Sequence, residues 1–333
     1  MSRAVWFTEP RTAVLQDDPV REPGSREVTV KAAYSLVSQG SEMHVFRGDG
    51  GLPDEFIPTM EGSFGFPVKF AYQTVGTVVA VGQDAGFAVG DRVFCTHPHQ
   101  ELFTLPIDFV ELIDERLDMR RAVFAGMFRV ATNCHLDAPV RIGEVVVVTG
   151  LGLIGTFAAF LARRSALKVI LVDTQESRRR RADWIGADAV VAPVDAPAAI
   201  SEMSDGRGAD VFIETSGSGA ALQLAVDQTA QEGVIAVPAW YGVNQVGLRL
   251  SPEFHLRRLR VVSSWVGVVG SGLQPRWNRS RLSATASHYL REVDIDSIIS
   301  HEIPFEDAPV AYKLIDEGVE DTLGVLLVHD HAS

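Results

Sequence analysis

The chain has 333 residues, and its 46% hydrophobic content is enough to bury a substantial core in about two domains. Its formal net charge of −13 argues against nucleic-acid and anionic-membrane partners, because these partners require a basic surface. The two cysteines provide no disulfide framework, and the first residues lack the long apolar core of a signal peptide, so we expect a cytoplasmic protein.

Three regions with different sequence patterns follow one another. Residues 1–125 contain short strand-like runs at 27–34, 75–81 and 92–95, separated by turns that contain glycine and proline. This pattern predicts an antiparallel, barrel-like region.

Strands and helices alternate over residues 126–266, which predicts a doubly wound parallel sheet. The expected strands lie at 145–149, 168–173, 189–192, 210–215, 233–238 and 260–266. Residues 267–333 return to mixed character, with a helix near 280–291 and a last strand at 322–329. The predicted fold class is therefore α/β.

The uncharged segment at 145–162 is just long enough to span a bilayer as a helix. Four consecutive valines favour a buried strand, however, and three glycines and a run of small residues follow them. We therefore expect a strand, a turn and a helix.

The turn in this segment carries the first motif with a chemical role. It reads Gly150-Leu151-Gly152-Leu153-Ile154-Gly155. In such a motif the first glycine makes the tight turn, the second lets a pyrophosphate approach the backbone, and the third lets the helix pack closely on the strand. The turn therefore predicts a dinucleotide-binding site.

An acidic residue indicates which nicotinamide cofactor is preferred. Asp173 ends the next strand, 18 residues after Gly155, where an acid holds the ribose hydroxyls of NAD and repels the 2′-phosphate of NADP. NADP stays open, because four arginines follow in the next helix and Arg178 is placed to bind that phosphate. We also expect Thr215, which ends the strand at 210–215, to contact the cofactor.

These features and several other segments resemble the medium-chain dehydrogenase/reductase (MDR) superfamily over nearly the full length. The segments are GSEMHVFRG at 40–48, VGTVVAVG at 75–82, VGDRVF at 89–94 and HEIPFEDAPVAYKLIDEG at 301–318. The resemblance implies a GroES-like catalytic domain at 1–125, a Rossmann domain at 126–266 and a return to the catalytic domain at 267–333. It also implies hydride transfer between a nicotinamide and a carbonyl, alcohol or activated alkene, and a homodimer formed through the edge strand near 261–266.

The chain departs from this family at the expected zinc ligands. Zinc-dependent members carry cysteine and histidine where this chain has Gln39 and Tyr72, and the third-ligand region reads Gly126-Met127-Phe128. None of these side chains is a thiolate, an imidazole or a carboxylate. The structural zinc of such members needs four closely spaced cysteines, so we expect no zinc at either position.

A different metal site stays open at His97 and His99, with Cys95 and Glu101 nearby. The proline between the two histidines favours the alternative, which is a hydrogen-bonded loop that lines the cleft.

A proton path is retained although the metal ligands are lost. In zinc-dependent relatives a hydroxyl residue two positions after the cysteine contacts the substrate oxygen, and a histidine three positions further passes the proton to solvent. Ser41 and His44 stand at these spacings. Tyr72, near the vacated metal position, would add a donor for the charge that develops on a ketone oxygen. The alternatives are a filler role for Tyr72 and a self-capping turn for Ser41 and His44.

The substrate pocket is expected to be aromatic, which suits a bulky, planar or cyclic molecule. Its expected lining is Gln39, Phe64, Gln73, His97, Phe128, Trp240 and Trp265. The alternative is that these aromatic residues belong to the core. The Gly-Ser-Glu block and the Tyr-Gln replacement resemble the zinc-less branch around bacteriochlorophyllide dehydrogenase.

The sequence therefore predicts a zinc-independent, NAD-preferring oxidoreductase that interconverts a secondary alcohol and a ketone. Its substrate is expected to be a fairly bulky small molecule of specialised metabolism. One alternative is an enone or quinone reductase of the same superfamily. A second alternative is a protein that binds NAD(P)H without turnover.

Overall fold

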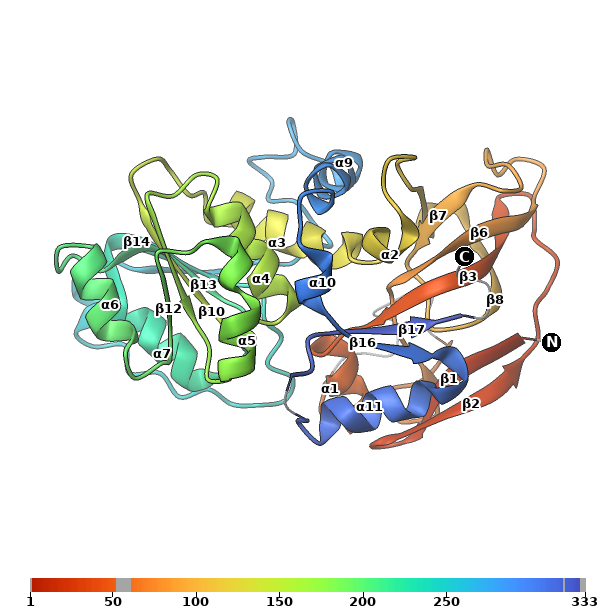
Figure 1. Cartoon of the computed structure of the whole chain (residues 1–333), viewed down its shortest axis with the longest axis horizontal. Helices are drawn as coiled ribbons and strands as arrows, with labels where there is room; N and C mark the ends of the chain where they lie inside the picture. Colours follow the sequence, from red (N-terminus) through yellow and green to blue (C-terminus); the bar gives the residue numbers. More distant parts are fainter. Residues whose placement is uncertain (1, 52–60, 320, 330–333) are drawn as a thin grey trace. The chain divides into compact units, whose positions relative to one another are not determined.

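The computed structural model describes residues 2–51, 61–319 and 321–329. The chain forms two compact units (Figure 1). The first unit joins Met1–Ala125 to Leu290–Ser333, and the second unit is Gly126–Tyr289. In Figure 1 the first unit runs from red to yellow and returns in dark blue, and the second runs from yellow through green to light blue.

The first unit consists mainly of strands with short helices between them. Its elements are β1 (Ser2–Glu9), β2 (Thr12–Asp18), β3 (Glu27–Val37), α1 (Ser41–Arg47), β4 (Glu61–Gly62), β5 (Val68–Lys69), β6 (Thr74–Val81), β7 (Arg92–Cys95), β8 (Leu102–Pro106), β9 (Val110–Leu112), α2 (Met119–Ala122), α10 (Ile295–Ile298), β16 (Ile299–Pro304), α11 (Ala308–Asp316) and β17 (Gly324–Val328). Single 3-10 turns lie at Ile107–Phe109 and Phe305–Asp307.

Two sheets organise this unit. The larger one has seven strands in the order β16-β17-β3-β6-β7-β9, with β8 also paired to β3, and the smaller one has the order β2-β1-β5-β4. Strand β17 pairs antiparallel with β3 from Val325 opposite Val37 to Val328 opposite Tyr34. This pairing brings the last strand of the chain beside one of the first, so the C-terminal segment completes the first unit (Figure 1).

The core of the larger sheet is formed by β-branched and aromatic side chains. Val28 and Val30 of β3 alternate with residues on the other face, as a pleated strand requires. They pack in one buried cluster with Val78 of β6, Val93 of β7 and Phe103 of β8. Helix α1 lies in the chain between β3 and β6, and it contacts α11.

The second unit alternates strands and helices. Its elements are α3 (Ala125–Asp137), β10 (Val145–Thr149), α4 (Leu153–Ala162), β11 (Lys168–Val172), α5 (Glu176–Arg181), β12 (Ala189–Val191), α6 (Ala196–Met203), β13 (Ala209–Glu214), α7 (Gly219–Gln228), β14 (Thr229–Val237), α8 (Glu253–Leu256), β15 (Arg260–Ser263) and α9 (Arg279–Leu290), with a 3-10 turn at Asp183–Ile185.

The six strands of this unit form one parallel sheet in the order β12-β11-β10-β13-β14-β15. Helices α4, α6 and α7 pack against its strands (Figure 1). Every residue of the central strand β10 is buried, which agrees with its uninterrupted run of valines. The predicted α/β fold with a doubly wound parallel sheet is confirmed.

The second unit extends beyond the predicted domain end at residue 266. Helix α9 packs on α3 through Tyr289, whose ring is stacked on Phe128 with centroids 6.3 Å apart. Arg129 also donates from Nη1 to the Ser283 hydroxyl at 3.1 Å. These contacts keep residues 267–289 with the second unit, so the return to the first unit comes at Leu290.

The uncharged segment at 145–162 forms β10, a turn and α4, as predicted. In the part of the chain that the structure describes, every helix is too short or too polar to cross a lipid bilayer.

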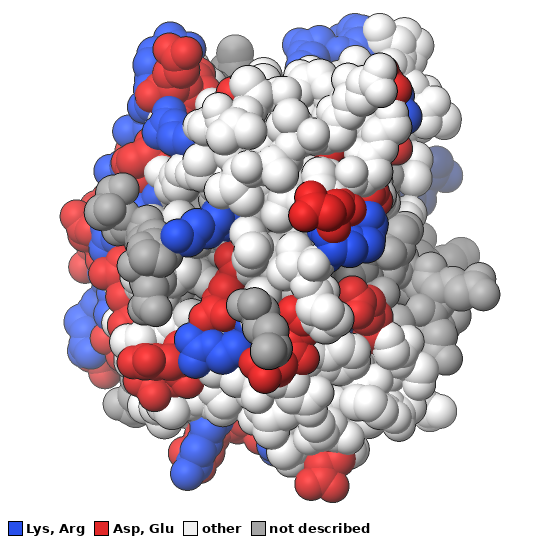
Figure 2. Space-filling model, turned by 90° about the vertical axis from the view of Figure 1, so that its right-hand side faces the viewer, with Lys and Arg blue, Asp and Glu red and all other residues white. Residues whose placement is uncertain are grey.

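Acidic and basic side chains are interspersed on the face shown in Figure 2. Among the described residues visible there, the blue side chains form no continuous basic surface. The absence of a nucleic-acid partner stays a prediction made from the net charge.

Candidate active site

The glycine-rich turn of the second unit has the geometry of a dinucleotide-binding turn. Gly150 has φ +83°, a conformation that favours glycine. A Cβ atom on Gly155 would lie 1.8 Å from the carbonyl oxygen of Gly150, so helix α4 packs as closely as a backbone allows. A Cβ atom on Gly152 would meet nothing within 4 Å, so this face of the turn is open to a ligand. The turn therefore fits a pyrophosphate group.

Asp173 follows β11, and its carboxylate is hydrogen-bonded to the glycine-rich turn and to the residues just after β11. Its Oδ2 accepts from the backbone N–H of Leu151 at 2.6 Å, and its Oδ1 accepts from that of Gln175 at 2.7 Å. The side chain is 6% exposed. Asp173 thus holds the glycine-rich turn in place and keeps a negative charge at the end of β11.

The four arginines of α5 have different environments. Arg178 is partly buried on the helix. Arg179 donates from Nη1 to the carbonyl oxygens of Asp173 and Thr174, at 2.7 and 3.0 Å. Arg180 forms an ion pair with Glu176. The sequence singled out Arg178, but Arg179 is the arginine that folds onto the loop after β11.

Thr215 lies at the end of β13, beside the glycine-rich turn. Its hydroxyl donates to the carbonyl oxygens of Thr149 and Gly150, at 2.9 and 2.6 Å. The preceding Glu214 is fully buried and accepts from the Ser216 N–H at 2.7 Å and from the Tyr241 hydroxyl at 2.6 Å. Thr215 thus supports the turn, and the Glu214 and Tyr241 pair is a feature that the sequence analysis missed.

In the first unit, Tyr72 lies just before β6 and is hydrogen-bonded to the loop that leads into α1. Its hydroxyl donates to Ser38 Oγ at 2.7 Å. Burial raises the pKa of Tyr72, hydrogen bonding to Ser38 and Ser41 acts in the opposite direction, and the charge of Glu42 adds to the rise. The net effect is a raised pKa, so Tyr72 is a protonated hydrogen-bond donor at neutral pH. The structure thus brings Tyr72 and Ser41 together.

Glu42 is a fully buried carboxylate beside this pair, and the sequence analysis missed it. It accepts from the Ser38 N–H at 2.9 Å, from His99 Nε2 at 3.0 Å and from the Tyr312 hydroxyl. One signal was available, because helical spacing places Glu42 on the same face as the buried Val45 and Phe46. Its partners His99 and Tyr312 are 57 and 270 residues away in the chain and could not be inferred.

His44 lies in the last part of α1 and is partly buried. Its Nδ1 is 2.5 Å from Asp49 Oδ1. A carboxylate that accepts from Nδ1 fixes the ring orientation and leaves Nε2 for a further proton exchange. This contact fits the predicted relay role but does not require it.

The residues predicted to line a substrate pocket lie in different environments within the first unit. Gln39 donates to the Leu323 carbonyl oxygen at 2.8 Å, and Gln73 is 2% exposed. His97 is 5% exposed, its Nδ1 donates to the Pro98 carbonyl oxygen, and its ring is stacked on Phe103. Phe64 is partly buried against Phe70.

The three predicted pocket residues of the second unit differ in exposure. Phe128 is fully buried among Phe157, Phe160 and Tyr289, so it is a core residue. Trp240 is partly buried and Trp265 is 57% exposed. For Phe128 the structure agrees with the alternative prediction, in which the aromatic residue belongs to the core.

The donor set in the predicted zinc positions does not suit zinc. Gln39 offers an amide, Tyr72 offers a phenol, and the third-ligand region Gly126-Met127-Phe128 contains no thiolate, imidazole or carboxylate, which are the ligands that zinc prefers. Over residues 2–51, 61–319 and 321–329, no three His, Cys, Asp or Glu side chains are grouped to hold a metal ion. His97 and His99 are each hydrogen-bonded to another group.

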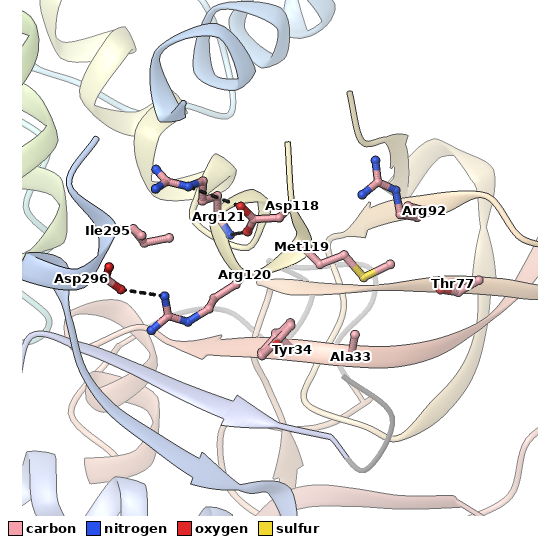
Figure 3. Close-up of a pocket in the computed structure, with 10 residues that line it drawn as sticks. All are labelled: Ala33, Tyr34, Thr77, Arg92, Asp118, Met119, Arg120, Arg121, Ile295 and Asp296. Carbon is pink, nitrogen blue, oxygen red and sulfur yellow. Dashed lines mark hydrogen bonds and ion pairs between the residues drawn. The ribbon is translucent and has the colours of Figure 1, made fainter. Parts of the chain in front are cut away.

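A cavity of about 530 Å³ lies within the first unit, apart from these residues (Figure 3). Its lining is Ala33, Tyr34, Thr77, Arg92, Asp118, Met119, Arg120, Arg121, Ile295 and Asp296. Figure 3 shows Arg120 paired with Asp296 and Arg121 with Asp118. The arginines of this cavity therefore bind neighbouring protein groups, and none of the predicted site residues lines it.

Comparisons with known proteins agree with this geometry. Residues 154–280 match the family model described as zinc-binding dehydrogenase. D-guloside 3-dehydrogenase of Escherichia coli is 29% identical over 341 residues, covering 95% of this chain and 97% of that protein. Sorbitol dehydrogenase of Halalkalibacterium halodurans is 26% identical over 349 residues, covering 94% of each chain.

A solved structure shows the same fold. It is an oxidoreductase/dehydrogenase of unknown specificity, involved in membrane biogenesis, from Escherichia coli. The TM-score is 0.84 at 18% identity, with 99% of each chain covered.

These findings identify the class of the protein. It is an enzyme, an NAD(P)-dependent oxidoreductase of the dehydrogenase type. The chain is similar to named dehydrogenases over nearly its full length, and its residues 154–280 match the zinc-binding dehydrogenase model. The matched residues 154–280 lie within the second unit, so the family model does not cover Gln39, Tyr72 or Met127.

Two buried histidines of the first unit make its stability depend on pH. Burial lowers the pKa of His97 to about 3 and that of His329 to about 3. An unfolded histidine takes up its proton near pH 6.5, so the unfolded state binds more protons between about pH 6.5 and pH 3. The free energy of unfolding therefore falls as the pH is lowered through this window.

Replacement of His329 by glutamine should weaken the dependence of the unfolding free energy on pH. The weakening should correspond to about one proton fewer taken up on unfolding. Urea denaturation at several values between about pH 5.5 and pH 4, where an unfolded histidine is almost fully protonated, measures it. The exposed His255 provides the control, since His255→Gln should leave the slope unchanged. An equal slope in His329→Gln and in the unmodified protein would contradict the assignment.

Proposed function

We propose that the protein interconverts a secondary alcohol and a ketone with a nicotinamide cofactor and without a metal ion. The observation that carries the proposal is the hydrogen bond of Tyr72 to Ser38, with Ser41 also interacting with the Tyr72 hydroxyl. These groups lie where the sequence resemblance expects the substrate oxygen to be bound.

Tyr72 and Ser41 would supply the electrostatic part of the reaction. The nicotinamide, when bound, donates or accepts a hydride at the substrate carbon. During reduction the carbonyl oxygen gains negative charge, and hydrogen-bond donors aimed at that oxygen stabilise it. The raised pKa of Tyr72 keeps the phenol protonated at neutral pH, and its one proton, which is donated to Ser38 Oγ in this structure, would turn to the substrate oxygen when the substrate binds.

His44 would restore the proton that Tyr72 or Ser41 gives to the product alcohol. It is held by Asp49, and its side chain is 17% exposed, so it has access to solvent. Histidine exchanges protons near neutral pH, which suits a relay between a hydroxyl group and water. In alcohol oxidation the same path would run in the opposite direction.

Zinc independence is proposed from the chemistry of the side chains. An amide and a phenol stand at two of the expected ligand positions, and the region of the third, Gly126-Met127-Phe128, holds no preferred zinc ligand. Glu42 and His99, a buried carboxylate and a buried imidazole of the first unit, are hydrogen-bonded to each other.

NAD is proposed as the preferred cofactor because Asp173 keeps a negative charge at the end of β11. Replacement of Asp173 by serine should weaken NADH binding by about 10-fold to 100-fold, the range expected for lost charged hydrogen bonds. The preference for NADH over NADPH should narrow, since the repulsion of a 2′-phosphate is removed. Fluorescence titration with both cofactors measures this, with the exposed Glu202→Gln as the control. An unchanged NADH:NADPH ratio would count against the role of Asp173.

Two observations support the proposed substrate class. The sequence suggests a fairly bulky organic molecule, and the curated relatives are named for a guloside, sorbitol and threonine, all of which carry hydroxyl groups. We therefore propose a hydroxylated substrate with a secondary alcohol. The likeness to the bacteriochlorophyllide dehydrogenase branch, the homodimer through β15 and the cytoplasmic location stay predictions.

A substrate panel tests the proposal. Methyl glycosides, sugar alcohols, L-threonine and bulky cyclic alcohols would be incubated with NAD⁺ at pH 8 to 9, and NADH formation would be recorded by absorbance. Cyclic ketones, enones and quinones would be tested with NADH and NADPH in the reverse direction. Turnover of an alcohol or ketone supports the proposal. Turnover restricted to enones or quinones supports alkene reduction instead, and cofactor binding without any turnover supports a non-catalytic binder.

A further inference from the structure

We propose that Glu42 is a positioning residue that fixes the hydrogen bond between Ser38 and Tyr72. The inference rests on the proposed role of Tyr72 as the donor to the substrate oxygen. It concerns a residue that touches neither substrate nor cofactor in this account and acts through the backbone of Ser38.

Glu42 joins three segments of the first unit that are far apart in the sequence. Its Oε2 accepts from the backbone N–H of Ser38 at 2.9 Å, in the loop before α1. Its Oε1 accepts from His99 Nε2 at 3.0 Å, in the loop between β7 and β8, and from the hydroxyl of Tyr312 on α11. The carboxylate therefore connects the loop before α1, the loop between β7 and β8, and helix α11.

The Ser38 N–H and the Tyr312 hydroxyl donate to Glu42, and His99 Nε2 also donates in the tautomer that carries its proton there. A carboxylate has only acceptor sites, whereas a carboxylic acid would need an acceptor for its own proton. Both Glu42 and His99 are fully shielded from solvent in their side chains. A buried charge without such partners would be strongly unfavourable, so the donors from Ser38, His99 and Tyr312 make the position tenable.

The bond to the Ser38 N–H connects Glu42 to the candidate active site. Ser38 is 4% exposed, and its hydroxyl oxygen accepts from Tyr72 at 2.7 Å. Because the backbone of Ser38 is held by Glu42, the hydroxyl of Ser38 has a defined place, and the phenol of Tyr72 is oriented by it. Glu42 also immediately follows Ser41, so it anchors the first turn of α1 that carries the Ser41 hydroxyl.

Replacement of Glu42 by glutamine is a sharp test, because glutamine has the same shape but only one oxygen. That oxygen can accept either from Ser38 or from the pair of His99 and Tyr312. The amide nitrogen then faces a donor on the other side, and two donors repel. If the oxygen keeps His99 and Tyr312, the backbone of Ser38 is released.

The experiment is a double-mutant cycle on the best alcohol or ketone of the substrate panel, with saturating NAD⁺ or NADH. We expect E42Q to lower kcat by about 10-fold, within the range for a misplaced catalytic group, with a smaller change in KM. In the Y72F background the same substitution should change kcat by less than about twofold, because Glu42 acts through Tyr72. The cofactor affinity of the second unit should be unchanged in all four proteins.

Additive losses in the double variant would overturn the inference, because Glu42 would then act independently of Tyr72. An unchanged kcat in E42Q alone would also overturn it. A kcat in Y72F equal to that of the unmodified protein is a different outcome. It would overturn the proposed donor role of Tyr72 and the inference with it. A Glu302→Gln variant serves as the control, because Glu302 pairs with Arg120 elsewhere in the first unit.

A second variant keeps the inference testable if E42Q does not fold. Ser38→Ala retains the backbone N–H that donates to Glu42 and removes only the hydroxyl that accepts from Tyr72. We expect S38A to lower kcat by about as much as E42Q and to be non-additive with Y72F. Full kcat in S38A would contradict the proposed connection between Glu42 and Tyr72.

Discussion

Replacement of Gly155 by alanine is expected to remove most NADH binding, with an increase in Kd of about 100-fold. The added Cβ atom would lie 1.8 Å from the carbonyl oxygen of Gly150 and 2.7 Å from the hydroxyl oxygen of Thr215. The first of these is a backbone atom and cannot rotate away. Helix α4 would have to move off the turn, and the backbone that binds the pyrophosphate would move with it. Isothermal titration with NADH measures the loss.

Two further glycine variants separate binding from folding. Gly152→Ala adds a Cβ atom that meets nothing within 4 Å, so the unligated fold should be unchanged while the cofactor loses its close approach to the backbone. Gly247→Ala is the control, since this glycine also has open space around it and lies outside the turn. NADH affinity in Gly155→Ala equal to that of Gly247→Ala would contradict the assigned binding turn.

Replacement of Tyr72 by phenylalanine is expected to lower kcat by about 100-fold or more, in line with the loss of one donor to a developing oxyanion. The ring remains, so its packing against Phe70 is kept and only the hydroxyl is lost. The affinity for NADH should be unchanged. Steady-state kinetics on the best substrate of the panel, with NADH titration on the same preparation, separate these two effects.

Tyr34→Phe is the matched control for this substitution, because Tyr34 lies in the same unit but lines the separate cavity. Its kcat should equal that of the unmodified protein. If Tyr72→Phe also retains full kcat, Tyr72 is a filler of the space left by the absent ligand, and the alternative kept open by the sequence analysis is correct.

The sequence predicted the second unit well because its signals are local. The run of valines predicted a strand at 145–149 and the structure has β10 at Val145–Thr149. The glycines that follow it form a tight turn, in which Gly155 packs on the carbonyl oxygen of Gly150 only five residues earlier, although the close approach of Gly150 to Ser216 joins distant parts of the chain. The end of the unit was placed at 266 instead of 289, because the packing of Tyr289 on Phe128 joins residues far apart in the chain.

The candidate site of the first unit was predictable only in part. Ser41 and Tyr72 could be found by resemblance at their positions, but the hydroxyl of Ser38 that accepts from Tyr72 could not. Glu42 was visible as a charged residue on an apolar helix face, whereas Tyr312 comes from the last helix of the chain. Phe128 was placed in the pocket and lies in the core, because a sequence does not show which aromatic rings meet one another.

Metal content measured together with turnover tests the central claim most directly. The protein would be purified untagged and without chelator, and zinc would be determined by plasma mass spectrometry on the same sample that binds NADH and turns over its substrate. The account predicts less than about a tenth of an equivalent of zinc, and turnover that EDTA does not change. About one equivalent of zinc, with turnover lost on chelation and restored by zinc, would contradict it and return the reaction to Lewis-acid polarisation of the carbonyl.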